Sequence, residues 1–217
     1  MKRFDLRVLM SILGLVAVTL ACALPGSGNS DGSILRDDFS NSGSGWGTGT
    51  DTNYSVQYAN EGLQLIVYSG YYITWSNPDT EIYENVHVDV SVKNDSTDPL
   101  AIFGIICHEQ VTQSFYYLGV AADGYYTISK SQVGTDDVSF ANGTSTAIPA
   151  LGSGPFTMGA DCGTGNLALY VNGQQIATAQ DATYTSGKVG LFAWTDEQAN
   201  GANVTFDDFV LTALPQQ

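Results

Sequence analysis

Short runs of alternating apolar and polar residues fill most of this chain after Ile34. The runs are rich in Val, Ile, Tyr, Phe and Thr, and Gly, Asn, Asp or Pro separates them, which is typical of strands joined by turns. No window has the long apolar pattern at helical spacing that predicts a helix. Many short antiparallel strands with regular turns predict an all-β fold built as a two-sheet sandwich. The predicted strands cover residues 34–39, 54–59, 62–68, 71–75, 86–93, 100–108, 114–122, 125–132, 155–162, 166–171, 174–180, 187–194 and 203–212.

Two dipeptides predict tight hairpins between neighbouring strands. Asp123-Gly124 and Asn172-Gly173 each supply the positive φ angles that a two-residue turn requires. A tight turn also fixes which residues face each other across the hairpin. The pairs expected to face each other are Tyr117 with Lys130, Ala121 with Tyr126, and Leu169 with Ile176.

The beginning of the chain has a different pattern, in which a basic leader precedes an apolar run. Lys2, Arg3 and Arg7 come before residues 8–21, which carry no charge. The run is too short to span a bilayer comfortably as a helix. A basic leader, an apolar stretch and a small residue at the cleavage point predict an export signal.

The apolar run ends in Ala21-Cys22, which resembles the bacterial lipobox. In that family a peptidase cuts before the cysteine, and lipid is attached to its sulfur and to its new amino group. The resemblance implies a signal peptide at 1–21 and a lipidated Cys22, so that membrane lipid is a partner. Several acyl chains, palmitate among them, anchor a protein firmly. The mature protein is then expected on the extracytoplasmic face of the bacterial cell envelope. The alternative is an ordinary secretory signal that is cut nearby, with Cys22 discarded.

The part of the chain after the signal divides into a spacer and one domain. Residues 22–33 follow the lipidated cysteine with small and polar side chains, which predict a flexible linker. Residues 34–217 have a length that suits a single all-β domain.

The charge of the mature chain excludes some partners. Removal of residues 1–21 takes away three of the 7 basic residues and one of the 22 acidic ones, which leaves a formal net charge of −17. So few cations argue against nucleic acid, whose phosphates require Lys and Arg. They also argue against binding of anionic lipid through the protein surface.

Two further cysteines lie on apolar strand faces. Cys107 shares a face with Phe103 and Ile105, and Cys162 shares one with Met158 and Ala160, because strand side chains alternate. Export makes a disulfide between Cys107 and Cys162 possible. Two buried free thiols are the alternative.

Several segments resemble the concanavalin A-like lectin and glucanase jelly rolls of bacterial surface proteins. This group includes laminin G-like modules and the domain of the 3-keto-disaccharide hydrolases, and the resemblance covers residues 34–213. It implies a jelly-roll sandwich but leaves the activity open, because the fold hosts lectins, hydrolases and adhesion modules. The segments are Leu35-Arg-Asp-Asp-Phe-Ser40, Ser44-Gly-Trp46, Ser114-Phe-Tyr-Tyr117, Leu169-Tyr-Val-Asn-Gly-Gln174, Gly187-Lys-Val-Gly-Leu191 and Phe206-Asp-Asp-Phe209.

No complete catalytic motif is present in the sequence. Glucanases of this fold carry Glu-x-Asp-x-x-Glu on one strand, which places their carboxylates on one face. The nearest cluster here, Asp79-Thr-Glu81-Ile-Tyr-Glu84, has the wrong residue types and follows a proline. A Gly-x-Ser-x-Gly elbow and a phosphate loop are also missing. The sequence therefore assigns no catalytic residue.

One sheet face is a candidate for ligand binding. With Cys107 pointing inward, His108 points outward, and the predicted hairpin brings Tyr117, Tyr126 and Lys130 to the same surface. Aromatic faces bind the C–H patches of sugars, and a few polar groups bind the hydroxyls. Trp194, at the start of a strand-end loop, is a further candidate contact. A partly covered face without a ligand, and core packing of Trp194, are the alternatives.

Four acids are candidates for a structural calcium site, and no other cofactor is expected. Asp37, Asp38, Asp207 and Asp208 lie on the predicted first and last strands, which often pair in this fold. Calcium takes several oxygen ligands. Solvated or hydrogen-bonded carboxylates are the alternative.

Together these patterns predict a membrane-anchored lipoprotein whose β-sandwich binds a partner, with glycan as the expected ligand. An enzyme acting on a sugar derivative, with His108 or a loop acid as base, is the second hypothesis. A structural or adhesion module is the third.

Overall fold

The computed structural model describes residues 32–78, 81–196 and 201–215. The predicted signal peptide, Cys22 and nearly all of the linker lie outside the described residues, as does Asp79. Asp31–Gln217 forms a compact unit of its own. Among the described residues, no helix is long and apolar enough to cross a membrane.

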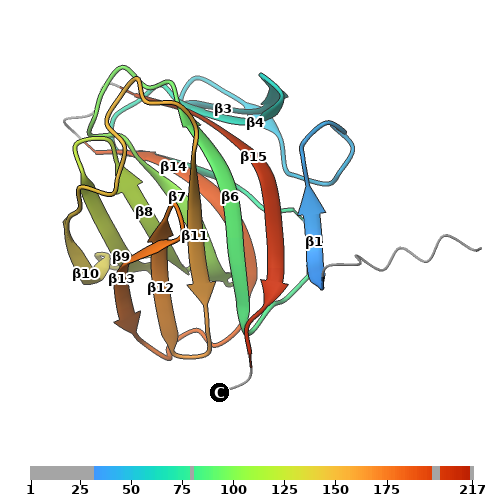
Figure 1. Cartoon of the computed structure of the whole chain (residues 1–217), viewed down its shortest axis with the longest axis vertical. Coiled ribbons are helices and arrows are strands. Elements are labelled where there is room, and N and C mark those ends of the chain that lie inside the picture. The colour runs from blue at the N-terminus through green and yellow to red at the C-terminus, as the bar shows by residue number, and fades with distance from the viewer. Residues whose placement is uncertain (1–31, 79–80, 197–200, 216–217) are drawn as a thin grey trace, which may run out of the picture. The chain divides into compact units, whose positions relative to one another are not determined.

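The described chain is built from strands (Figure 1). The prediction of an all-β, two-sheet sandwich is confirmed. The strands are β1 (Ser33–Asp37), β2 (Gly49–Thr50), β3 (Tyr54–Ala59), β4 (Gly62–Val67), β5 (Tyr72–Ser76), β6 (Val86–Asn94), β7 (Ile102–Glu109), β8 (Phe115–Ala121), β9 (Tyr125–Ser131), β10 (Val138–Thr144), β11 (Phe156–Cys162), β12 (Asn166–Val171), β13 (Gln174–Gln180), β14 (Lys188–Thr195) and β15 (Ala202–Ala213).

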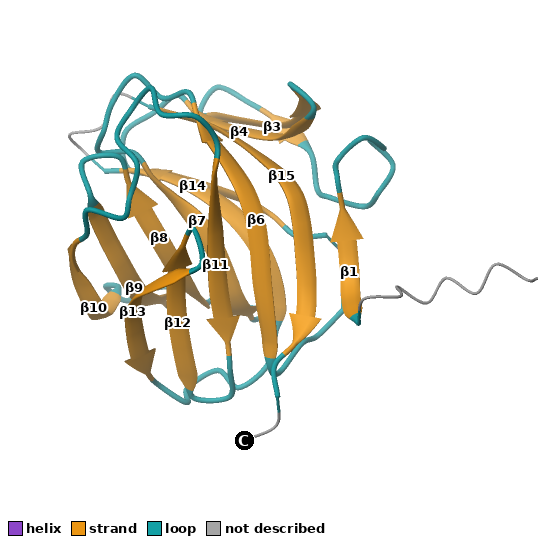
Figure 2. Ribbon diagram, viewed as in Figure 1, coloured by secondary structure: helices purple, strands orange, loops and turns teal. Residues whose placement is uncertain are grey.

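The strands form two antiparallel sheets, which Figure 2 shows as two layers. The nine-stranded sheet has the order β13-β12-β11-β6-β15-β4-β3-β2, and β1 pairs with β15. The six-stranded sheet has the order β10-β9-β8-β7-β14-β5. The first and last strands of the domain are therefore neighbours in one sheet.

The hydrophobic core lies between the two sheets and follows from side-chain alternation. Val86, Val88, Val90 and Val92 of β6 are buried, whereas the residues between them are half-buried on the outer face. In contrast, β7 and β8 are buried at every position. The outer face of the six-stranded sheet therefore carries a second apolar cluster in addition to the main core.

The β8–β9 hairpin corrects one predicted register. Three residues separate β8 from β9, and Gly124, at φ 94°, donates its N–H to the carbonyl oxygen of Ala121 at 3.0 Å. This is a longer turn than the two-residue loop that Asp123-Gly124 predicted. Lys130 consequently faces Tyr116, and Tyr126 faces Val120. A shift of one residue moves every side chain of a strand to the opposite face.

The β12–β13 hairpin agrees with the prediction at its turn and departs from it further along. Asn172 and Gly173, at φ 50° and 74°, form the predicted two-residue turn, and Val171 faces Gln174. A bulge then places Leu169 opposite Ala177 and not opposite Ile176. One extra residue in a strand is enough to shift the pairing beyond it.

A disulfide between Cys107 of β7 and Cys162 of β11 links the two sheets, with the Cα atoms 5.4 Å apart. Both cysteines lie in the main core. The bond holds together strands that no backbone hydrogen bond connects, because they belong to different sheets.

Candidate functional site

A group of aromatic rings covers the outer face of the six-stranded sheet. We call Trp75, Phe115, Tyr117, Phe192 and Trp194 the aromatic layer. The ring centroids of Trp75 and Phe115 are 5.5 Å apart, those of Tyr117 and Phe192 5.8 Å, and those of Tyr117 and Trp194 6.4 Å. The layer therefore runs continuously across strands β5, β14, β7 and β8.

Glycine makes room for these rings. A Cβ atom at Gly119 of β8 would lie 2.8 Å from Ile102 Cγ2 and 2.9 Å from Phe192 Cζ. Because Gly119 has no side chain, Phe192 lies directly against the sheet and is fully buried. Trp75 and Trp194, at the two ends of the layer, remain half-buried, so that part of each indole ring can contact a ligand.

A buried carboxylate borders the layer at Trp75. The Oε1 atom of Glu109 accepts a hydrogen bond from Trp75 Nε1 at 3.1 Å. Glu109 is only 8% exposed, and its Oε2 atom has no hydrogen-bond partner among the described residues. A buried acceptor without a partner is costly, and each such group in a folded protein requires an explanation.

A second carboxylate borders the layer at Tyr117. The Tyr117 hydroxyl donates to Asp137 Oδ2 at 2.9 Å. Burial and the negative charge of Asp137 raise the pKa of Tyr117, so the phenol stays protonated and remains a donor. Beside it, Thr127 and Ser129 of β9 are buried with their hydroxyl oxygens 2.7 Å apart. The layer thus continues into a stripe of hydroxyl groups.

A pocket of about 490 Å³ adjoins the layer along the edge strand β5. Trp75, Asn77 and Lys188 line it, together with the loop that contains Gly47. Lys188 is the β14 partner of Glu109 in the sheet. This edge of the layer therefore holds an indole ring, an amide, an ammonium group and a carboxylate, which is the mixture that small-molecule sites use.

The predicted outward position of His108 is wrong. The β7–β14 pairing contains a bulge between Ile106 and Glu109, and His108 adopts a φ of 53°. The extra residue turns the imidazole into the interior, where it is 0% exposed. Its two ring nitrogens lie 2.9 Å from the carbonyl oxygens of Glu84 and Tyr184. Burial lowers the pKa of His108. The bulge brings Glu109 to the outer face, which the alternation of the sequence could not predict.

The predicted grouping of Tyr126 and Lys130 with Tyr117 is also wrong, because of the register shift in the β8–β9 hairpin. Tyr126 packs against the main core. Lys130 Nζ lies 3.6 Å from Asp181 Oδ2 and 5.5 Å from the centre of the Phe140 ring. Among the five predicted ligand contacts, Tyr117 and Trp194 share the outer face of the six-stranded sheet.

The four acids predicted to bind calcium lie on β1, β15 and the turn after β1. Both carboxylate oxygens of Asp37 accept hydrogen bonds, from the Phe39 N–H and from Trp46 Nε1. Burial raises the pKa of Asp207, and the negative charges of Asp208, Asp38 and Glu61 add to the effect. Among the described residues, no three His, Cys, Asp or Glu side chains are grouped so as to hold a metal ion. Calcium binding at Asp37, Asp38, Asp207 and Asp208 stays a prediction.

Comparison with solved structures identifies the fold. No protein-family model matches the chain. No curated protein matches it in sequence. The carbohydrate-binding module CBM66 from Bacillus subtilis is similar with a TM-score of 0.62 and 14% identity, over 78% of this chain and 96% of that one. A Bacillus subtilis protein of unknown function with a galectin-like fold is similar with a TM-score of 0.63 and 13% identity, over 85% of this chain and 97% of that one. A Bacillus licheniformis beta-glucanase is similar with a TM-score of 0.60 and 14% identity, over 84% of this chain and 99% of that one. The domain therefore has the predicted concanavalin A-like jelly-roll fold.

Proposed function

We propose that this domain is a glycan-binding module and that its ligand lies across the aromatic layer. The observation that carries the proposal is the pair of half-buried indoles, Trp75 and Trp194, on the same sheet face as Tyr117. The apolar C–H face of a sugar ring packs against such rings. Among proteins of similar fold, one is named a carbohydrate-binding module and another a beta-glucanase. These likenesses support the fold directly and the ligand class only by analogy.

The polar groups at the border of the layer complement the hydroxyls of a sugar. Glu109 and Asp137 are acceptors, whereas Lys188 and Asn77 provide donors at the Trp75 end. Because Glu109 Oε2 is buried, a bridging water would satisfy its missing hydrogen bond and link it to a sugar hydroxyl. Hydrogen bonds of this kind fix the orientation of a ligand that the rings hold.

The proposal includes attachment to the cell envelope. Lipid on Cys22 would anchor the chain, and residues 22–33 would act as a flexible spacer between the membrane and the domain. The module would then present its aromatic layer to glycans outside the cytoplasm. The low number of cations fits a neutral ligand better than a polyanion.

Turnover of a sugar derivative is the second candidate function, and the two carboxylates favour it. Glycosidases use pairs of carboxylates, one of which has to be protonated for catalysis. Glu109 is buried beside an indole, whereas Asp137 is exposed, so the two acids have different surroundings. If the domain is an enzyme, Glu109→Gln should abolish release of reducing ends from a bound oligosaccharide while binding persists. Binding without turnover in the unaltered protein would leave the module as the function.

A glycan array on residues 31–217, followed by calorimetry, tests the binding proposal. We expect Trp75→Ala and Trp194→Ala each to cost about 1–3 kcal/mol of binding free energy through lost apolar contact. Tyr68→Ala is the matched control, because Tyr68 is 55% exposed and lies outside the aromatic layer. Equal affinity in the control and in both tryptophan variants would contradict the proposal, as would an array without any bound glycan.

A further inference from the structure

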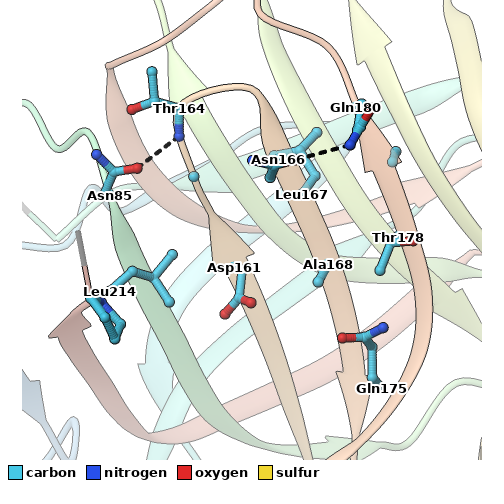
Figure 3. Close-up of a pocket in the computed structure, with 13 residues that line it drawn as sticks. Asn85, Asp161, Thr164, Asn166, Leu167, Ala168, Gln175, Thr178, Gln180 and Leu214 are labelled. Carbon is cyan, nitrogen blue, oxygen red and sulfur yellow. Dashed lines mark hydrogen bonds between the residues drawn. The ribbon is translucent and has the colours of Figure 1, made fainter. Parts of the chain in front are cut away.

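A second hollow lies on the opposite side of the sandwich, on the outer face of the nine-stranded sheet (Figure 3). Its volume is about 730 Å³. Strands β11, β12 and β13 form its floor, and residues after β15 close one side. None of its lining residues belongs to the aromatic layer.

The hollow exists because a small residue stands between larger ones. Asp161 of β11, Ala168 of β12 and Thr178 of β13 are successive partners across the sheet. Ala168 is 6% exposed, and its methyl group points to the outer face between the side chains of Asp161 and Thr178 (Figure 3). A larger residue at position 168 would fill the space.

Neutral amide side chains form the rim. Asn85 lines the hollow, and its Oδ1 accepts a hydrogen bond from the backbone N–H of Thr164 at 2.9 Å (Figure 3). Gln180 Nε2 donates to Asn166 Oδ1 at 3.3 Å (Figure 3). Gln175 also lines the hollow. Each amide carries two donor hydrogens and one acceptor oxygen, so the rim can exchange hydrogen bonds in both directions without any net charge.

A network fixes Asp161, whose carboxylate lines the hollow. Asp161 Oδ1 lies 2.6 Å from His87 Nδ1, and Asp161 Oδ2 accepts from the Tyr170 hydroxyl at 2.8 Å. On its other side, His87 Nε2 lies 3.2 Å from Asp89 Oδ2. Hydrogen bonds to Asp161 and Asp89 raise the pKa of His87 to about 9. At neutral pH one imidazolium therefore lies between two carboxylates, and the three side chains together keep one negative charge.

We propose that this hollow is a second binding site, whose ligand is a neutral, hydroxyl-rich saccharide unit. The amide rim matches hydroxyl groups, and Ala168 and Leu214 offer apolar contact to C–H groups. The negative charge that Asp161, His87 and Asp89 keep together disfavours an anionic sugar. The inference is independent of the aromatic layer. If both sites bind, one molecule bridges two glycan segments, which raises avidity.

Nuclear magnetic resonance on ¹⁵N-labelled residues 31–217 tests the site, because the rim amides give their own signals. The probes are maltotriose, laminaritriose and xylotriose at millimolar concentration, with trigalacturonate as the anionic comparison. We expect at least one neutral probe to shift the side-chain amide signals of Asn85, Asn166 and Gln180. Ala168→Leu should weaken that binding by about tenfold or more because it fills the floor. Thr157→Leu, on the same face of β11 but outside the hollow, is the matched control and should not weaken it.

The experiment separates the two sites. Trp194→Ala should leave the amide shifts intact, so failure of the aromatic-layer proposal would not affect the result. If Ala168→Leu does not fold by circular dichroism, the double variant Asn166→Ala and Gln180→Ala takes its place and should lose the binding. No amide shift with any neutral probe would overturn the inference. Unchanged affinity in the folded variant, or stronger binding of trigalacturonate, would overturn it as well.

Discussion

At the scale of single residues, the two histidines of the chain have opposite surroundings. His87 lies on an outer sheet face between two carboxylates, which raise its pKa to about 9. His108 lies in the interior, where burial lowers its pKa. The sequence places both in strands of alternating pattern, and only the bulge in β7 distinguishes them. The burial of His108 therefore depends on one inserted residue.

His87 gives a prediction for the pH dependence of stability. Its folded pKa of about 9 exceeds the unfolded value of about 6.5. The stabilisation is therefore complete below about pH 6.5 and is lost as the pH rises through about 9. We expect the free energy of unfolding to fall by about 1–3 kcal/mol over that range. Urea unfolding at several pH values measures this loss, and His87→Gln should remove most of it. An equally steep loss in the variant would contradict the assignment.

At the scale of elements, alternation and turn residues predict most strands but not their irregularities. The short strand β2 and the edge strand β10 were not predicted. The polar sequence of β10, with Asn142-Gly143 inside it, has the composition of a turn and becomes a strand only by pairing with β9. The predicted register of the two hairpins is wrong for a similar reason. A three-residue turn between β8 and β9 and a bulge between β12 and β13 each shift the pairing by one residue.

The same irregularities explain why the candidate site was only partly predicted. Tyr117 follows the alternation and lies on the outer face as expected, whereas Trp194, which was predicted as a contact in a strand-end loop, lies within β14 on the same face. His108 does not, and Glu109 occupies the outer position in its place. Trp75 reaches the layer because β5 is the edge strand beside β14, a neighbourhood that depends on sheet order and not on local pattern.

The disulfide gives a prediction at the level of paired elements. Cys107 and Cys162 are 55 residues apart and join β7 to β11 across the core. In the loop-entropy account, removing such a bond lowers stability by about 2–4 kcal/mol. We expect the Cys107→Ala, Cys162→Ala double variant to unfold at correspondingly lower urea concentration than the oxidised protein. Reduced wild-type protein serves as the control. Two freely alkylated thiols in the native, exported protein would refute the bond.

At the scale of the whole molecule, the proposed anchor decides where the domain works. Cys22→Ala should abolish lipid attachment, because the thiol is the lipid acceptor. Metabolic labelling with a fatty-acid analogue measures this, with Cys107→Ala as the control that removes a cysteine from the domain. Labelling of the Cys22 variant at the wild-type level would rule out the lipoprotein assignment.

The two sheet faces give the whole molecule two distinct surfaces. The outer face of the six-stranded sheet is aromatic and has carboxylates at its border, whereas the hollow of the nine-stranded sheet has amide side chains at its rim. One jelly roll can therefore meet a ligand by ring packing on one side and by hydrogen bonding on the other.

The central claim is that glycan lies across the aromatic layer, and the indole N–H signals of the three tryptophans test it most directly. Trp75 and Trp194 end the layer, whereas Trp46 is buried elsewhere and donates its indole N–H to Asp37 at 2.8 Å. During titration with a glycan found on the array, the signals of Trp75 and Trp194 should shift in a saturable way, while that of Trp46 stays in place. Binding that leaves Trp75 and Trp194 unshifted would contradict the account.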